Sequence, residues 1–143
     1  MAGMTFTDAL DLTAFKRRGG KMMLYQGASD SSVSIKDTLC WYDAMNSMME
    51  SKTGAKAQNF ARMCVVPGMA HCSGGLATDN FDMLPQLVDW VEKGVAPDSV
   101  LAAASNPGYF NVFARTWPLC PYPNQTRYKG AGDINEAANF TCQ

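Results

Sequence analysis

Two short apolar runs, each followed by a polar loop and a helical pattern, constrain the fold of this chain most strongly. The runs are residues 21–27 (KMMLYQG) and residues 60–68 (FARMCVVPG). Both end in glycine, and both have the length of a fully buried strand in a parallel sheet. We therefore expect two strands at these positions, each leading into a loop and then a helix.

The helical patterns are stripes of apolar residues that recur every three or four positions. The first stripe consists of Ile35, Leu39, Tyr42, Met45 and Met49, and the second of Phe81, Leu84, Val88 and Val91. Gly54 and Gly94 follow these stripes and are the expected helix ends. The order strand, helix, strand, helix predicts an α/β fold built on a right-handed βαβα unit with parallel strands.

The amino-acid composition changes after Asn106. Residues 107–143 are rich in proline, glycine and aromatic residues and show little periodicity. We expect this segment to be an irregular C-terminal extension, pinned by Cys120 and Cys142. Residues 1–143 are expected to form one domain at most, because the chain is too short for more.

Composition excludes several classes of function. The net charge is −1 and no basic stretch occurs, so neither nucleic acid nor an anionic membrane surface is an expected partner. The longest apolar run falls far short of the roughly 20 residues that a membrane span needs. The first 20 residues contain no apolar core of a signal peptide, so no signal peptide is visible.

The chain has one histidine, His71, in the glycine-flanked loop VPGMAHCSGG that follows the second apolar run. Asp30 lies in the loop after the first run, and loops after parallel strands open at the same edge of a sheet. A carboxylate there could fix the tautomer of the imidazole and stabilise its protonated form. A loop aspartate is more often a turn former and a lone loop histidine more often solvated, so spacing alone leaves those alternatives open.

Neither a nucleophile nor a metal site is evident in the sequence. The nucleophile motif G-x-S-x-G does not occur, and its nearest approximation, GASDS, lacks the final glycine. His71, Cys72 and Cys64 could be considered as zinc ligands, but they lack a C-x-x-C or H-x₃-H spacing. No metal or other cofactor is therefore expected in this chain.

Five segments resemble the C-terminal part of the tannase and feruloyl esterase family. They are GASDSSVS, VPGMAHCSGG, LVDWVEKGVAPDS, PLCPYP and YKGAGDINEAANFTC, and they follow one another from about Leu10 to Cys142 in the family's order. Members of that family are secreted α/β-hydrolases that cleave esters of aromatic acids. The resemblance implies that residues 1–143 are the C-terminal portion of such a hydrolase sheet, without the N-terminal half or the lid domain.

The resemblance also assigns roles to individual residues. It implies that Asp30 is the acid of a Ser-His-Asp triad, that His71 is the general base, and that Cys72 forms a disulfide with a cysteine beside the nucleophilic serine. Such a bridge would hold the base and the nucleophile at a fixed separation, and small displacements in this geometry cost rate steeply. Cys120 and Cys142 are expected to pair, and Cys40 and Cys64 to be buried.

The expected function is that of a serine carboxylesterase acting on esters of aromatic or phenolic acids. This chain would supply the acid and the base but not the serine, and would be inactive alone. The family's calcium site would lie in the lid, outside this chain. The expected partners are the ester substrate and the N-terminal half, and the expected location of the intact protein is secreted or periplasmic. The alternative is a non-catalytic α/β domain that binds an aromatic ligand or another protein chain.

Overall fold

The chain folds around two parallel strands that are joined by a long helix. The computed structural model describes residues 9–105 and 114–143. Strand β1 (Met22–Gly27) pairs in parallel with strand β2 (Ala61–Val66), and helix α2 (Ile35–Thr53) connects them. The two predicted strands, the first predicted helix and the α/β class are therefore confirmed.

The register of the strand pair brings both following loops to one edge. Met22 lies opposite Ala61, and Gly27 lies opposite Val66, so the two strands end side by side. Among the described residues, no strand pairs with the other edge of β1. The candidate site therefore lies at the carboxyl end of this pair, and the backbone along one side of β1 has no strand partner in the described part of the chain.

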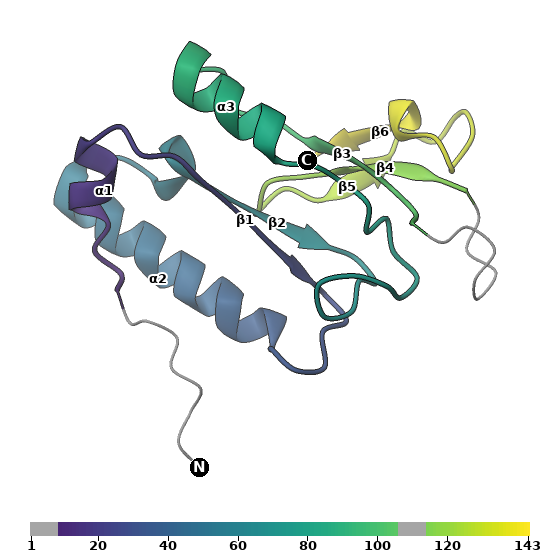
Figure 1. Ribbon diagram of the computed structural model, residues 1–143, viewed down its shortest axis with the longest axis horizontal. Coiled ribbons are helices and arrows are strands. Elements are labelled where there is room, and N and C mark those ends of the chain that lie inside the picture. Colours follow the sequence, from purple (N-terminus) through teal and green to yellow (C-terminus); the bar gives the residue numbers. More distant parts are fainter. Residues whose placement is uncertain (1–8, 106–113) are drawn as a thin grey trace.

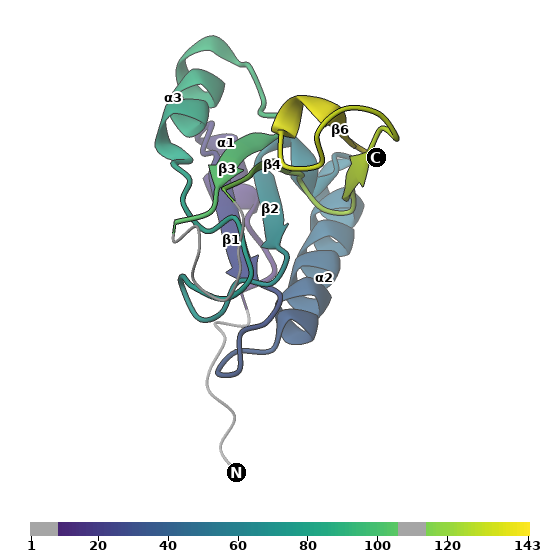
Figure 2. The ribbon, with the colours of Figure 1, turned by 90° about the vertical axis from the view of Figure 1, so that its right-hand side faces the viewer.

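Helices cover the two sides of the strand pair, as Figures 1 and 2 show, with α2 on one side and α3 (Leu84–Lys93) on the other. Alternate residues of β2 face the two sides, as the period of a strand requires. The core under α2 consists of Tyr42, Met45, Met49, Ala57, Phe60, Ala61 and Met63. The core on the opposite side consists of Cys64, Val66, Met69, Ala77, Val100, Ala102 and Leu119.

Helix α2 buries its predicted stripe but not its cysteine. Tyr42, Met45 and Met49 are fully buried, and the helix ends at Gly54, whose φ of 67° suits a glycine. Cys40, which we expected to be buried, is exposed. It follows Leu39 directly, and one residue turns an α-helix by about 100°, which carries Cys40 off the apolar stripe.

Helix α3 begins at Leu84, three residues later than the apolar pattern suggested, and ends at Gly94 as predicted. Trp90 anchors it, and its ring lies under the Lys21 ammonium and the Arg62 guanidinium at 5.1 and 5.5 Å from the ring centroid. Its apolar stripe is not covered: Leu84 is 63% exposed and Val91 58%. The described part of the chain therefore leaves this stripe of α3 exposed.

Short strands occupy the segment that we expected to be irregular. Strand β3 (Val100–Ala103) pairs antiparallel with β4 (Thr116–Leu119), and β5 (Thr126–Tyr128) pairs antiparallel with β6 (Phe140–Cys142). A 3₁₀ turn, η3 (Ala137–Asn139), precedes β6. The expectation of an irregular extension over 107–143 is therefore wrong for β4, β5 and β6, while turns, bends and the 3₁₀ turn η3 make up most of the rest of 114–143 and residues 107–113 lie outside the described part.

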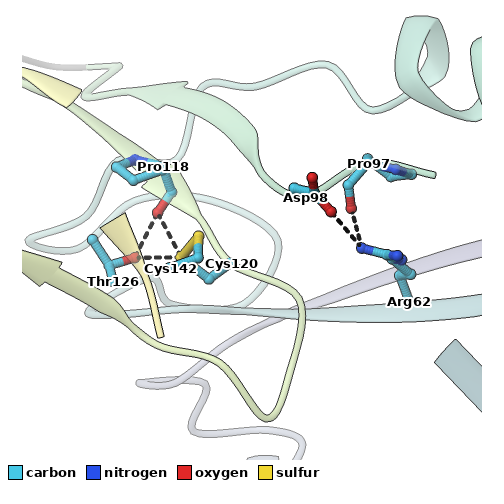
Figure 3. Close-up of a disulfide and its surroundings, with 7 residues drawn as sticks. All are labelled: Arg62, Pro97, Asp98, Pro118, Cys120, Thr126 and Cys142. Atoms are coloured by element: carbon cyan, nitrogen blue, oxygen red, sulfur yellow. Dashed lines mark hydrogen bonds and ion pairs between the residues drawn. A yellow bond between two sulfur atoms is a disulfide. The ribbon is translucent and has the colours of Figure 1, made fainter. Parts of the chain in front are cut away.

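The predicted disulfide between Cys120 and Cys142 is present and joins the end of β4 to β6, with a Cα–Cα distance of 5.5 Å. Beside it, the Thr126 hydroxyl donates a hydrogen bond to the Pro118 carbonyl at 2.5 Å (Figure 3). The bridge thus holds the last strand against the rest of the extension.

One hydrogen bond fixes the extension to the strand pair, and contacts of Arg62 fix the segment that precedes β3. The N–H of Tyr122 donates to the Met63 carbonyl at 2.7 Å, which places the extension along the outer edge of β2. The Arg62 side chain donates to the Pro97 carbonyl and lies 3.6 Å from the Asp98 carboxylate (Figure 3). The segment between α3 and β3 is therefore tied to the start of β2.

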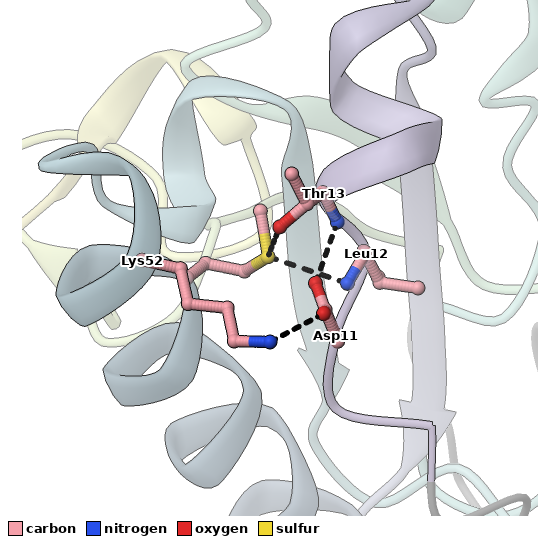
Figure 4. A network of polar contacts seen from close by, with 5 residues as sticks. Asp11, Leu12, Thr13 and Lys52 are labelled. Atoms are coloured by element: carbon pink, nitrogen blue, oxygen red, sulfur yellow. Dashed lines mark hydrogen bonds and ion pairs between the residues drawn. The ribbon is translucent and has the colours of Figure 1, made fainter.

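The segment before β1 packs against the end of α2. Helix α1 (Thr13–Arg17) follows Asp11, whose carboxylate accepts hydrogen bonds from the Lys52 ammonium at 2.6 Å and from the Thr13 N–H at 3.0 Å (Figure 4). These hydrogen bonds hold the pKa of Asp11 below its usual value. After α2, a 3₁₀ turn, η1 (Ala57–Asn59), leads into β2. No helix in the described ranges is long and apolar enough to cross a membrane.

Candidate active site

The structure brings Asp30 and His71 together at the carboxyl edge of the strand pair. The Nδ1 atom of His71 lies 2.8 Å from Oδ2 of Asp30, across 41 positions of sequence. Asp30 follows β1 and His71 follows β2, so the parallel register accounts for their meeting. The predicted juxtaposition of the two side chains is therefore present in the fold.

A close backbone approach behind the pair makes this contact possible. The N–H of Ser29 donates to the Met69 carbonyl at 3.0 Å, and the N–H of Ala28 donates to the Val66 carbonyl at 2.9 Å. A Cβ atom at Gly27 would collide with the Met69 carbonyl oxygen. Glycine at the end of β1 therefore lets the two loops touch.

Asp30 is held in one orientation by its own loop. Its Oδ1 atom accepts the N–H of Ser32 at 2.7 Å and the N–H of Val33 at 3.1 Å, which leaves Oδ2 for His71. Burial disfavours the charged carboxylate, whose side chain is only 5% exposed, but the hydrogen bonds from Ser32, His71 and Val33 outweigh this effect. Together they hold the pKa of Asp30 below its ordinary value, so the carboxylate is charged at neutral pH.

His71 lies at the rim of the site, with its side chain 57% exposed. If Nδ1 donates its hydrogen to Asp30, the second ring nitrogen, Nε2, carries a lone pair and can accept a proton. This is the arrangement by which an imidazole acts as a general base. The sequence contains no G-x-S-x-G segment, so the pair is a candidate acid and a candidate base without a recognisable nucleophile motif.

A tight turn presents His71. The N–H of Ser73 donates to the His71 carbonyl at 2.9 Å, and the N–H of Ala70 donates to the Gly74 carbonyl at 3.1 Å. Cys72 lies within this turn at a φ of 65°, a conformation that few residues other than glycine adopt. Its thiol is free and the residue is exposed, on the same short turn as the candidate base.

Sequence analysis missed Asp79, which lies behind the turn. Its Oδ2 atom accepts the N–H of Gly74 at 2.6 Å, and its Oδ1 atom accepts the N–H of Ser105 at 3.0 Å. An aspartate in a polar loop carries no periodic or motif signal, and nothing in the sequence links positions 79 and 105. Its only sequence cue was its place four residues after the glycine pair of the histidine loop.

The described residues bring together no group of three or more His, Cys, Asp or Glu side chains that could hold a metal ion. A cavity of about 920 Å³ lies between the start of β2 and the C-terminal strands, where Arg62 and Tyr122 are among its lining residues. This cavity contacts neither Asp30 nor His71.

The sequence also resembles known proteins along almost its whole length. It is 56% identical over 132 residues to mono(2-hydroxyethyl) terephthalate hydrolase of Piscinibacter sakaiensis, which covers 92% of this chain and 21% of that protein. The structure superimposes on feruloyl esterase B from Aspergillus oryzae with a TM-score of 0.76 and 29% identity, covering 94% of this chain and 29% of the other.

Tannin acyl hydrolase from Aspergillus niger shares the fold, with a TM-score of 0.76 at 22% identity over 96% of this chain and 25% of the other. The chain thus spans well under a third of the length of each of these proteins. The sequence profile described as tannase and feruloyl esterase matches residues 2–143. With this match, and with the hydrolase relative above, the chain belongs to the tannase and feruloyl esterase family.

Proposed function

We propose that this chain supplies the acid and the general base of a serine carboxylesterase that hydrolyses esters of aromatic acids. The observation that carries the proposal is the 2.8 Å contact between Asp30 Oδ2 and His71 Nδ1 at the carboxyl edge of the strand pair. The serine nucleophile and the oxyanion hole come from a further part of the protein. The polypeptide that contains this chain and that part is called the complete enzyme below.

In the complete enzyme His71 removes a proton from the serine hydroxyl as the oxygen attacks the ester carbonyl. The proton then passes from His71 to the departing alcohol, and the acyl group stays on the serine. A water molecule then gives a proton to His71 and attacks the acyl carbonyl. The proton passes to the serine oxygen as the acid is released. Asp30 stabilises the imidazolium at each stage, and the hydrogen bonds from Ser32 and Val33 keep its carboxylate charged and oriented.

The substrates in the names of two relatives support the proposed substrate class. Mono(2-hydroxyethyl) terephthalate and feruloyl esters share an aromatic acid joined to an alcohol through an ester bond. The cavity of about 920 Å³ contacts neither member of the acid–base pair, which supports the proposal that the nucleophile-bearing part of the complete enzyme contributes the binding site for the aromatic ring. The calcium site expected from the resemblance would also lie outside this chain, and no proposed step on this chain depends on it.

Comparing two esters tests this proposal. The complete enzyme should hydrolyse methyl ferulate with a kcat/KM at least tenfold above that for methyl butyrate, and the 143-residue chain alone should hydrolyse neither. The tenfold figure is the discrimination that about 1.4 kcal/mol of additional transition-state binding provides, which is modest for a buried ring. Turnover by the 143-residue chain alone, or equal rates on the two esters, would contradict the assignment.

The uncovered surfaces of β1 and α3 support the proposal that a further part of the protein packs against them. Parallel sheets are normally covered on both faces and contain more than two strands. Here β1 has one edge without a strand partner in the described ranges, and Tyr25 on that strand is 48% exposed. Leu84 and Val91 of α3 are also uncovered. We propose that the nucleophile-bearing part extends the sheet at β1 and covers these side chains, as in an α/β-hydrolase.

Cys72 is the proposed covalent link to that part. Cys72 is exposed on the turn that presents His71, directly after the proposed base, which supports a bridge to the nucleophile-bearing part. A disulfide from Cys72 to a cysteine beside the serine would fix the distance between base and nucleophile. Such a bridge, like the Cys120–Cys142 bridge, forms in an oxidising compartment, which agrees with a secreted or periplasmic enzyme.

Alkylation without reduction should divide the five cysteines into three groups. In the 143-residue chain, Cys40 and Cys72 should react quickly because both are exposed, and the bridged pair only after reduction. Cys64 should react only after unfolding, since burial raises the pKa of its thiol to about 12. In the complete enzyme Cys72 should become unreactive until reduction while Cys40 still reacts. A Cys72 that stays free in the complete enzyme would contradict the proposed bridge.

A further inference from the structure

A hydrogen-bond network behind the candidate base, half-buried at Asp79 and Gly74 and exposed at Ser105, connects its turn to the C-terminal strands. At its centre is Asp79, which accepts the N–H of Gly74 with one oxygen at 2.6 Å and the N–H of Ser105 with the other at 3.0 Å. Burial disfavours the charge of this carboxylate, but the hydrogen bonds from Ser105 and Gly74 outweigh it and hold the pKa of Asp79 below its usual value. Both oxygens are therefore charged acceptors at neutral pH.

On one side, the bond to Gly74 fixes the closing residue of the turn that presents His71. The Gly74 carbonyl accepts the N–H of Ala70, so residues 70 and 74 are held together at the base of the turn. Gly74 has a φ of 78°, and Gly75 has one of 84°. This backbone has little intrinsic preference for one conformation, because glycine populates such φ values freely. An external anchor is therefore needed to keep the turn in place.

On the other side, Asp79 is attached to the end of β3. Asn80 and Ala103 exchange backbone hydrogen bonds, both at 2.9 Å, and Ser105 follows two residues later. β3 pairs with β4, and β4 is followed directly by Cys120 of the disulfide. A continuous series of bonds thus runs from the disulfide-closed extension through β4, β3 and Asp79 to the turn of His71.

We propose that Asp79 is a positioning residue that holds the turn of His71 in register with Asp30, and that the C-terminal strands support the base through it. Asp79 does not reach the reacting atoms. It acts by restricting the backbone of Gly74, three residues after His71. The catalytic role of His71 in this inference rests on the proposed function. The positioning of His71 by Asp79 is a property of this chain and can be measured on it.

Nuclear magnetic resonance of the imidazole nitrogens tests the proposal directly, because His71 is the only histidine and gives one set of signals. The ¹⁵N shifts at high pH, where the ring is neutral, should show the proton mainly on Nδ1 in the wild-type chain. In Asp79→Ala the two tautomers should approach equal populations. Amide exchange at Gly74 should rise by about tenfold or more, as expected when a bond to a charged acceptor is lost.

Two further variants control the experiment. Asp82→Ala removes a carboxylate three residues along the same loop, which accepts the Leu84 N–H at 2.9 Å and touches nothing in the turn, so both readouts should stay at their wild-type values. Asp79→Asn preserves the size of the side chain but leaves one acceptor oxygen and no charge. It should show the same two changes at smaller amplitude, and it serves if Asp79→Ala does not fold.

The outcomes separate this inference from the proposed function. A wild-type chain with no preference for the Nδ1 proton would contradict the Asp30–His71 contact and both proposals with it. A wild-type preference that neither Asp79 variant changes would overturn only the positioning role. Equal effects from Asp82→Ala would also overturn it, because they would show a general loosening of the loop.

Discussion

Replacing His71 with alanine is expected to lower kcat of the complete enzyme by about 10⁵-fold or more, with little change in KM. Without the imidazole, nothing in the described site can take the serine proton, since the pair at this edge contains no other base. The side chain of His71 is 57% exposed and packs little, so the variant should retain its fold. Steady-state rates on methyl ferulate, with circular dichroism as the check on folding, measure this effect.

Added imidazole provides the control for that loss. Because the truncated side chain leaves an open space at the rim of the site, free imidazole should restore part of the lost rate in His71→Ala and none in the wild type. A His71→Ala enzyme that keeps more than about a tenth of wild-type kcat would rule out His71 as the general base, since general-base catalysis alone contributes about 10²-fold or more.

Asp30→Asn should lower kcat by about 10⁴-fold while leaving the backbone of the site unchanged. The new amide oxygen can still accept the N–H groups of Ser32 and Val33. Its NH₂ group then faces Nδ1 of His71, which must become an acceptor. The imidazole proton moves to Nε2, and that nitrogen can no longer take the serine proton.

The matched control is Asp37→Asn, which removes an exposed carboxylate from the first turn of α2, seven residues from Asp30. Its kcat should equal that of the wild type. The same ¹⁵N shifts of His71 should show the tautomer change in Asp30→Asn and not in Asp37→Asn. A fully active Asp30→Asn enzyme would contradict the role of this carboxylate.

The lowered pKa of Asp30 sets the pH range in which the contact persists. The carboxylate is more acidic in the folded chain than in the unfolded chain, where its pKa is near 3.9. The stabilisation is therefore fully present above that value and is lost only as the pH falls through the lower folded pKa. The His71 signals should thus report an intact contact at pH 5.

The strand pair and α2 could be predicted because their signals are local. Short apolar runs bounded by glycine and a stripe at helical spacing each act within one element, and the parallel register then follows from the βαβ connection. That register brings the loops of Asp30 and His71 to the same edge, although the close backbone approach at Gly27 that lets the loops touch has no such local signal. The shared edge is why two residues 41 positions apart could be paired before the structure was known.

The extension could not be predicted because its contacts are nonlocal. β4 contains Pro118, which has no backbone N–H to donate to a neighbouring strand, so the sequence alone does not favour a strand at this position. It is a strand because Leu119 and Val100 lie opposite each other and bury their side chains in the core behind β2. The anchoring by Asp79 depends on the same pairing, since Ser105 reaches it only when β3 is in place.

Active-site labelling tests the central claim most directly. A fluorophosphonate forms a covalent bond only with a serine that is activated by its general base, and mass spectrometry then locates the label. In the complete enzyme we expect stoichiometric labelling of one serine outside these 143 residues, and we expect His71→Ala to abolish it while Asp82→Ala preserves it. A label on a serine within these residues, or undiminished labelling in His71→Ala, would contradict the account.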